Sequence, residues 1–258
     1  MKGQKTEYAT VYRVIDICNE ILSWILMVIL VCLFCYGTYG IGDSYVLEQD
    51  AMPQHYEVYR PTEEDSLSFE ELQAKNSDVC GWITIYGTHV DYPVVRGADN
   101  SVYLMRDPEG NYRMSGSIFM DCVNQREFTD FNTILYGHHM KSGQMFGSLS
   151  SYSDQSYCEK HPYIQFDTIY EKGLYEIMYV FRSRVYSEDE IVFKYYQFID
   201  AQSEQEFDSY MNDMAEMSLY DTGVTASFGD QLLTLSTCDY QEKNGRFVVV
   251  AKKVTTKE

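Results

Sequence analysis

The residues with the clearest chemical potential are a cysteine and an arginine near the carboxyl end of the chain, Cys238 and Arg246. They lie within residues 231–253, where two apolar, β-branched runs flank a polar break that ends in Asn244-Gly245. This pattern predicts a β-hairpin with a loop somewhat longer than the tight two-residue type. Because alternate strand residues share a face, folding at the break brings Cys238 beside Arg246. A neighbouring guanidinium favours the thiolate, which is the nucleophilic form of cysteine.

A histidine that could assist such a thiolate lies well upstream. Residues 133–136 form a β-type run that is followed by Gly137, His138 and His139. A single cysteine with a distant histidine is a recognised nucleophile pattern. Neighbouring strand residues point to opposite faces, so only one of the two imidazoles can serve. Taken alone, these residues also fit a buried core cysteine, a solvated strand-end arginine and a hydrogen-bonded strand-end histidine.

Three segments resemble one enzyme family. Residues 234–238, Thr-Leu-Ser-Thr-Cys, resemble the TLxTC signature of sortases, the cysteine transpeptidases of Gram-positive cell surfaces. Residues 135–139 resemble the histidine segment of class B sortases, and residues 245–250 resemble their arginine strand. The three segments occur in the family's order, and the resemblance covers roughly residues 66–254.

The resemblance implies three catalytic roles. Cys238 is expected to attack a peptide carbonyl, and His138, rather than His139, to act as acid and base. Arg246 is expected to bind the substrate carbonyl or the oxyanion and to help hold the thiolate, because arginine stays charged and presents several donors. Gly137 leaves room for backbone or substrate beside His138.

Four further residues are expected to line a substrate groove. Ser236 and Tyr136 each precede a catalytic candidate by two positions and share its strand face. In class B sortases an Asn-x-x-x-Leu pattern after a Tyr-Pro-Val-Val segment lines the groove, and Asn100 and Leu104 match this pattern. Ordinary packing in a barrel wall is the alternative for each of the four.

The resemblance also implies a reaction. Sortases cut a surface protein after the Thr of a C-terminal sorting motif, form a thioester and pass the protein to an amine. For class B the expected motif is NPxTN-like or related, and the expected acceptor is the cross-bridge amine of a peptidoglycan precursor. Two alternatives stay open: a pilin-polymerising sortase with a pilin lysine as acceptor, and a non-catalytic, membrane-tethered binding scaffold.

Composition limits the partners. Hydrophobic residues make up 45% of the 258-residue chain, as in globular proteins, and the formal net charge is -19. That charge argues against DNA, RNA or anionic lipid as a partner, and otherwise reflects solubility. The acidic residues are dispersed, and the CxxC pair Cys32 and Cys35 lies inside the apolar run 21–41, so no metal or other cofactor is expected. A disulfide between two of Cys80, Cys122 and Cys158 is left open.

The amino-terminal segment predicts a membrane anchor. Residues 21–41 contain no charged side chain and are long enough to cross a hydrocarbon core of ~30 Å as a helix. A signal peptide is the alternative, but its apolar region is usually only ~7–15 residues long. Lys2, Lys5 and Arg13 precede the run, so residues 1–20 are expected in the cytoplasm. Residues 42–65 are then expected to form an extracellular stalk, and residues 66–258 an extracellular catalytic domain tethered to the cell membrane.

The fold expected for residues 66–258 is mainly β. Short strands with turn signals predict a closed antiparallel barrel of about eight strands. A helix is expected within residues 66–75, and a second within 202–219, where apolar residues recur at spacings of three and four. The predicted strands are 81–86, 90–95, 115–120, 132–136, 163–168, 174–186 and 191–195, followed by the two strands of the hairpin.

Overall fold

The computed structural model describes residues 2–61 and 68–255 and divides into two compact units, residues 1–47 and 48–258. Helix α1 (Lys2–Asp50) contains the whole apolar run 21–41. Its stretch Tyr12–Asp50 is long and apolar enough to cross a membrane. Residues 42–50, expected to begin an irregular stalk, continue this helix, and the 3-10 helix η1 (Pro53–Tyr59) follows. Residues 62–65 of that segment lie outside the described part of the chain.

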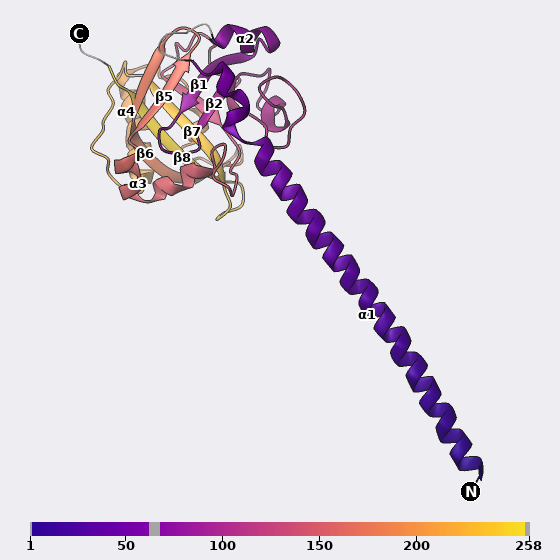
Figure 1. The fold of residues 1–258 in the computed structure, drawn as a ribbon. Helices are drawn as coiled ribbons and strands as arrows, with labels where there is room; N and C mark the ends of the chain where they lie inside the picture. The colour runs from indigo at the N-terminus through magenta and orange to yellow at the C-terminus, as the bar shows by residue number, and fades with distance from the viewer. Residues whose placement is uncertain (1, 62–67, 256–258) are drawn as a thin grey trace. The chain divides into compact units, whose positions relative to one another are not determined.

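The second unit is built on a closed barrel of eight strands, as predicted (Figure 1). Its order is β1-β2-β3-β4-β7-β8-β6-β5, and neighbours in this order are hydrogen-bonded. The strands are β1 (Val79–Thr84), β2 (Asp91–Val95), β3 (Ile118–Met120), β4 (Asn132–Tyr136), β5 (Tyr163–Thr168), β6 (Lys172–Arg184), β7 (Leu232–Asp239) and β8 (Gly245–Lys253).

The strand pairing is mixed rather than antiparallel throughout. Strand β2 pairs with β3 in parallel, and β4 pairs with β7 in parallel, while the other six pairs are antiparallel. A parallel pair needs a long crossover between its strands. Residues 96–117 form that crossover for the first pair, and residues 137–231, which include β5, β6 and helix α4, form it for the second.

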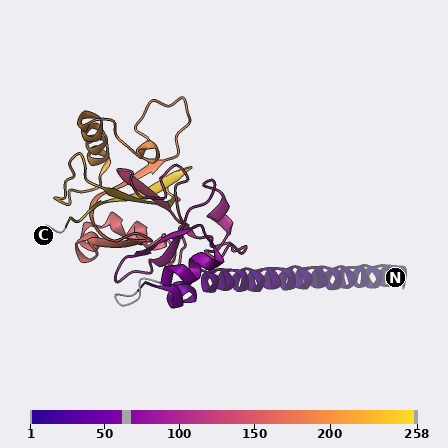
Figure 2. The ribbon, with the colours of Figure 1, turned by 90° about the horizontal axis from the view of Figure 1, so that it is seen from above.

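Helices α4 and α2 lie on different sides of the barrel (Figures 1 and 2). An apolar cluster lies between each of them and the barrel wall. Helix α4 (Glu204–Met217) begins at the N-cap Ser203, whose hydroxyl accepts a hydrogen bond from the amide of Glu206. It buries Phe207, Met211 and Met214 against β6, β7 and β8, so the apolar residues at spacings of three and four face the core. On the other side, α2 (Ser68–Lys75) and η1 contribute Leu72 and Tyr56 to a cluster with Trp82.

Residues 191–195 do not form the predicted strand. Residues 191–194 are irregular and lead into the short 3-10 helix η4 (Tyr195–Gln197). Tyr195 is drawn into the cluster beneath α4, where its ring contacts Phe181 edge-on at 5.9 Å between centroids. The remaining short elements are η2 (Val102–Met105), η3 (Gly147–Ser153) and α3 (Gln155–Lys160).

Candidate active site

The hairpin of β7 and β8 places Cys238 and Arg246 as the sequence predicts. The two residues are direct partners in the antiparallel register, so their side chains leave the same face of the sheet. The next pair, Asp239 and Gly245, closes the ladder, and residues 240–244 form the loop. Asn244 has a φ of 59°, a left-handed conformation that asparagine tolerates well. Cys238 is partly exposed at the strand end, as a nucleophile must be.

Strand β4 brings the histidine segment to the same end of the barrel. Tyr136 pairs with Ser236 in the parallel register, and the amide of Gly137 donates to the Ser236 carbonyl at 3.2 Å. The hydroxyl of Thr237 donates to the Gly137 carbonyl at 2.8 Å. His138 therefore follows a residue that is bonded twice to the strand of Cys238.

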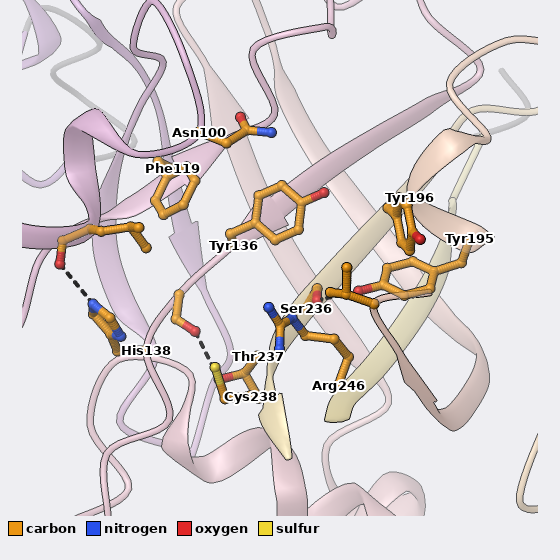
Figure 3. A pocket seen from close by; sticks show the side chains of 13 residues that line it. Asn100, Phe119, Tyr136, His138, Tyr195, Tyr196, Ser236, Thr237, Cys238 and Arg246 are labelled. Atoms are coloured by element: carbon orange, nitrogen blue, oxygen red, sulfur yellow. Dashed lines mark hydrogen bonds between the residues drawn. The ribbon is translucent and has the colours of Figure 1, made fainter. Parts of the chain in front are cut away.

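The His138 ring is held by a further contact. Its Nε2 lies 2.7 Å from the Leu104 carbonyl oxygen, which can only accept a hydrogen bond, so Nε2 carries the proton. A dashed line from the His138 ring marks this hydrogen bond in Figure 3. This contact connects the histidine segment to the long crossover between β2 and β3.

A cavity of about 280 Å³ lies where these segments meet. Figure 3 shows His138 on one side of Cys238 and the guanidinium of Arg246 on the other. All seven residues singled out from the sequence line the cavity. Its lining consists of Asn100, Leu104, Phe119, Tyr136, Gly137, His138, Val185, Tyr195, Tyr196, Ser236, Thr237, Cys238 and Arg246.

Sequence reasoning missed three aromatic residues of this lining, Phe119, Tyr195 and Tyr196. Tyr195 and Tyr196 were placed at or beyond the end of a predicted strand, and Phe119 looked like an ordinary strand residue. The hydroxyl of Tyr195 shares a hydrogen bond of 2.7 Å with the Ser236 hydroxyl beneath the cavity. Burial raises the pKa of Tyr195 to about 12, although this hydrogen bond works against the shift. Tyr195 is therefore a neutral wall residue at physiological pH.

His139 does not line this cavity. Strand β4 ends at Tyr136, so strand alternation does not reach the two histidines. His139 lies against the ring of Tyr240 at 5.4 Å between centroids, and its Nδ1 is buried without a hydrogen-bond partner in the described chain. Within the described residues, no group of three or more His, Cys, Asp or Glu side chains could hold a metal ion. All seven cysteines of the described chain are free, including Cys80, Cys122 and Cys158.

Comparisons with known proteins agree with this architecture. The Sortase domain model matches residues 83–254. Sortase B of Staphylococcus aureus is 37% identical over 206 residues, covering 79% of this chain and 79% of that protein. Sortase B of Listeria monocytogenes is 36% identical over 191 residues, covering 72% of this chain and 73% of that protein.

Solved structures give the same result. Sortase B from Bacillus anthracis in complex with AAEK1 superimposes with a TM-score of 0.70 at 38% identity, covering 82% of this chain and 98% of that one. A Staphylococcus aureus sortase B–substrate complex superimposes with a TM-score of 0.66 at 33% identity, covering 85% and 98%. By family model, sequence identity and fold, this chain belongs to the class B sortases, which are cysteine transpeptidases.

Proposed function

We propose that the cavity binds the C-terminal sorting motif of a surface protein, NPxTN-like or related, and that Cys238 cleaves it after Thr. The observation that carries the proposal is the cross-strand pairing of Cys238 with Arg246 in a cavity that His138 also lines. A solved Staphylococcus aureus sortase B–substrate complex and a sortase B complexed with Gly3 are similar to this chain, with a TM-score of 0.66 each, and support a peptide substrate and an amine acceptor.

The reaction runs in two halves through a thioester. The Cys238 thiolate attacks the Thr carbonyl carbon, and Arg246 donates hydrogen bonds to the oxygen on which negative charge develops. The carbon–nitrogen bond then breaks, and the protonated imidazole of His138 gives its proton to the leaving amine. In the second half an acceptor amine attacks the thioester carbon, His138 takes a proton from that amine, and the thiolate leaves.

The lining of the cavity supplies the substrate contacts. Ser236, Asn100 and Tyr136 offer polar groups, and Leu104 offers an apolar side chain that is 40% exposed. Pockets for peptides combine apolar walls with a few polar groups that fix orientation, and this lining has that composition. The acceptor in our proposal is the cross-bridge amine of a peptidoglycan precursor.

The amino-terminal helix gives the enzyme its place in the cell. Residues 21–41 anchor it as a single span, with residues 1–20 in the cytoplasm and residues 66–258 outside. Three basic residues before the span, and none in residues 42–59, support this orientation. A protease-accessibility assay on intact cells and spheroplasts tests it: the catalytic domain is cleaved in both, and an amino-terminal tag in neither.

Mass spectrometry of the acyl-enzyme tests the catalytic proposal. Incubation with a library of sorting peptides is expected to add the peptide segment through Thr to Cys238. The Cys238→Ala variant, with unchanged circular dichroism, is expected to gain no mass. A wild-type protein that gains no mass with any NPxTN-like peptide contradicts the proposal.

The acceptor is tested on the preformed thioester. A cross-bridge peptide is expected to discharge the acyl-enzyme faster than a lysine-bearing pilin segment does. Faster discharge by the pilin segment makes the protein a pilus polymerase instead. Discharge only by water contradicts transfer to an amine.

A further inference from the structure

A buried carboxyl group behind the cavity makes an unusual set of contacts. Asp121 directly follows β3 and is 4% exposed, yet it does not line the cavity itself. Its Oδ2 accepts hydrogen bonds from the Tyr136 hydroxyl at 2.8 Å and from Nδ2 of Asn100 at 3.1 Å. Its Oδ1 accepts from the amide of Val123 at 2.9 Å. All three partners are donors, so this side chain acts purely as an acceptor, as a carboxylate does.

These contacts fix the orientation of the Asn100 amide. Its Oδ1 accepts from the backbone amide of Cys122 at 2.8 Å, while its Nδ2 faces the carboxylate of Asp121. Turning the amide over would set donor against donor at Cys122 and acceptor against acceptor at Asp121. Asn100 therefore has one N–H left to offer to the cavity that it lines.

The same carboxylate fixes the polarity of Tyr136. The Tyr136 hydroxyl has a single hydrogen, which it donates to Asp121 in a hydrogen bond. The phenol oxygen can therefore only accept a further hydrogen bond. The ring itself is packed on Phe119 at 5.5 Å between centroids. Burial, with the nearby Asp121 carboxylate as the second cause, raises the pKa of Tyr136 above its ordinary value, so the phenol keeps its hydrogen.

We propose that Asp121 is a positioning residue that makes Asn100 a donor and Tyr136 an acceptor toward the bound peptide. One donor and one acceptor on neighbouring side chains complement an amide group, whose C=O accepts and whose N–H donates. The inference rests on the proposed function, because it assigns the orientation of the sorting peptide in that same cavity. Asp121 acts through the two lining residues and touches no reacting atom.

The Asp121→Asn variant weakens this control with almost no change in shape. An asparagine at this position has one acceptor and one donor end, but three donors face it. With its oxygen toward Val123, its NH₂ group meets Tyr136 and Asn100, which lose their fixed polarity. Turned over, its NH₂ group meets the Val123 amide, and Tyr136 and Asn100 keep only an uncharged acceptor in place of a carboxylate. Asp130 offers a matched control: it is also 4% exposed and accepts from the Gln125 amide and the Asn124 side chain, but neither of these partners lines the cavity.

The test measures binding of a blocked Asn-Pro-Ala-Thr-Asn peptide by calorimetry, with each variant made in the Cys238→Ala protein. Asp121→Asn is expected to weaken binding about tenfold, the effect of losing one hydrogen bond to a charged group. Asp130→Asn is expected to leave peptide binding unchanged, even if it lowers the melting temperature as much as Asp121→Asn does. With Cys238 present, Asp121→Asn is expected to raise KM, leaving kcat and the iodoacetamide alkylation rate of Cys238 unchanged.

The outcomes separate this inference from the proposed function. Equal peptide affinity in Asp121→Asn and its parent overturns the inference, as does an equal loss of affinity in Asp130→Asn. In both cases thioester formation by the wild-type protein still supports the proposed function. If the wild-type protein forms no thioester and the Cys238→Ala protein binds no peptide, the proposed function fails and the inference fails with it.

Discussion

Among the cysteines of the barrel unit, Cys238 differs in its surroundings. Cys80 is fully buried, and burial raises its pKa to about 12, which leaves little thiolate at neutral pH. Burial also raises the pKa of Cys158. Cys238 is partly exposed, lines the cavity and lies opposite an arginine. Position in the fold, rather than residue type, marks it as the proposed nucleophile.

Arginine and lysine are expected to differ at position 246. Arg246→Lys keeps the charge but loses the planar fork of donors, so kcat/KM is expected to fall by about 10²–10³, as when an oxyanion donor is removed. Steady-state kinetics of thioester formation measure the fall. Arg126→Lys, a partly exposed arginine bonded to the Ser77 carbonyl, serves as the control and should leave the rate unchanged. A lysine variant with wild-type kcat/KM would show that Arg246 supplies only charge.

A serine beside Arg246 is expected to be dispensable for stability. Ser183 pairs with Arg246 across β6 and β8, and its Oγ is buried without a hydrogen-bond partner in the described chain. Leaving such a group unsatisfied costs about 1–3 kcal/mol, so Ser183→Ala should leave the free energy of unfolding unchanged or raise it. Urea denaturation measures the difference. A loss of more than about 1 kcal/mol would mean that the hydroxyl has a partner in solution.

Elements with strong periodicity could be predicted from the sequence. Which strands pair, and which residues pack together, could not. Alternation and Asn244-Gly245 predicted the hairpin, and the spacing of apolar residues predicted α4. Residues 191–195 look like a strand locally, but in the structure Tyr195 is recruited to the core beneath α4 and hydrogen-bonds with Ser236. Tertiary packing overrode local propensity there. The two parallel pairings depend on which strands meet, and local pattern does not show that.

The candidate site divides in the same way. Cys238, Arg246 and His138 have distinctive side chains in recognisable segments, so alternation and family resemblance were enough to select them. Phe119 and Tyr195 are common core residues, and only the closed barrel brings them to the cavity. Asp121 escaped notice because it acts through other side chains from behind the cavity wall.

The hydrogen bond from Thr237 of β7 to Gly137 is expected to position the segment that carries His138. Thr237 is 2% exposed, and its hydroxyl donates to the carbonyl before His138. Thr237→Val keeps the shape and removes this bond, so we expect a loss of about 1 kcal/mol in stability and a clear fall in kcat. Thr234→Val is the matched control, because Thr234 lies on the same strand and donates to Asn132 at 2.8 Å, away from the cavity. It should lose similar stability and keep kcat, and equal kcat in both variants would contradict a positioning role.

Glycine at position 137 is required by close packing where β4 ends. A Cβ there would lie 2.4 Å from Cδ1 of Ile118 and 2.8 Å from Cδ2 of Phe146, closer than atoms in contact allow. Gly137→Ala is therefore expected to cost about 1–3 kcal/mol through overpacking and to displace His138. Adding Ile118→Val removes the nearer atom and should restore part of the stability in urea denaturation. If the double variant recovers no stability, the loss in Gly137→Ala comes from the backbone rather than from the contact with Ile118.

At the scale of the whole molecule, the stability of the fold should depend on keeping buried tyrosine and cysteine side chains protonated. The chain has 24 tyrosines and a net charge of -19 at pH 7. Burial raises the pKa of Tyr103 and of Tyr195 to about 12, as it does for Cys80. Each of these groups has a higher pKa in the folded protein than in the unfolded chain, so the unfolded chain loses the proton at a lower pH. The free energy of unfolding should therefore be much lower at alkaline pH than at neutral pH.

The sign of the pH dependence follows from these raised values. A group whose folded pKa lies above its unfolded pKa contributes its full stability below the unfolded value, about 9 for Cys80 and 10 for the tyrosines, and loses it as the pH rises toward about 12. The urea midpoint should thus stay level from pH 7 to about 9 and then fall steeply. Tyr195→Phe removes one of these groups and should reduce the slope of stability against pH above about 10. A midpoint that stayed level to pH 12 would show that these protons do not limit the fold, because water would then reach groups that the closed barrel should exclude.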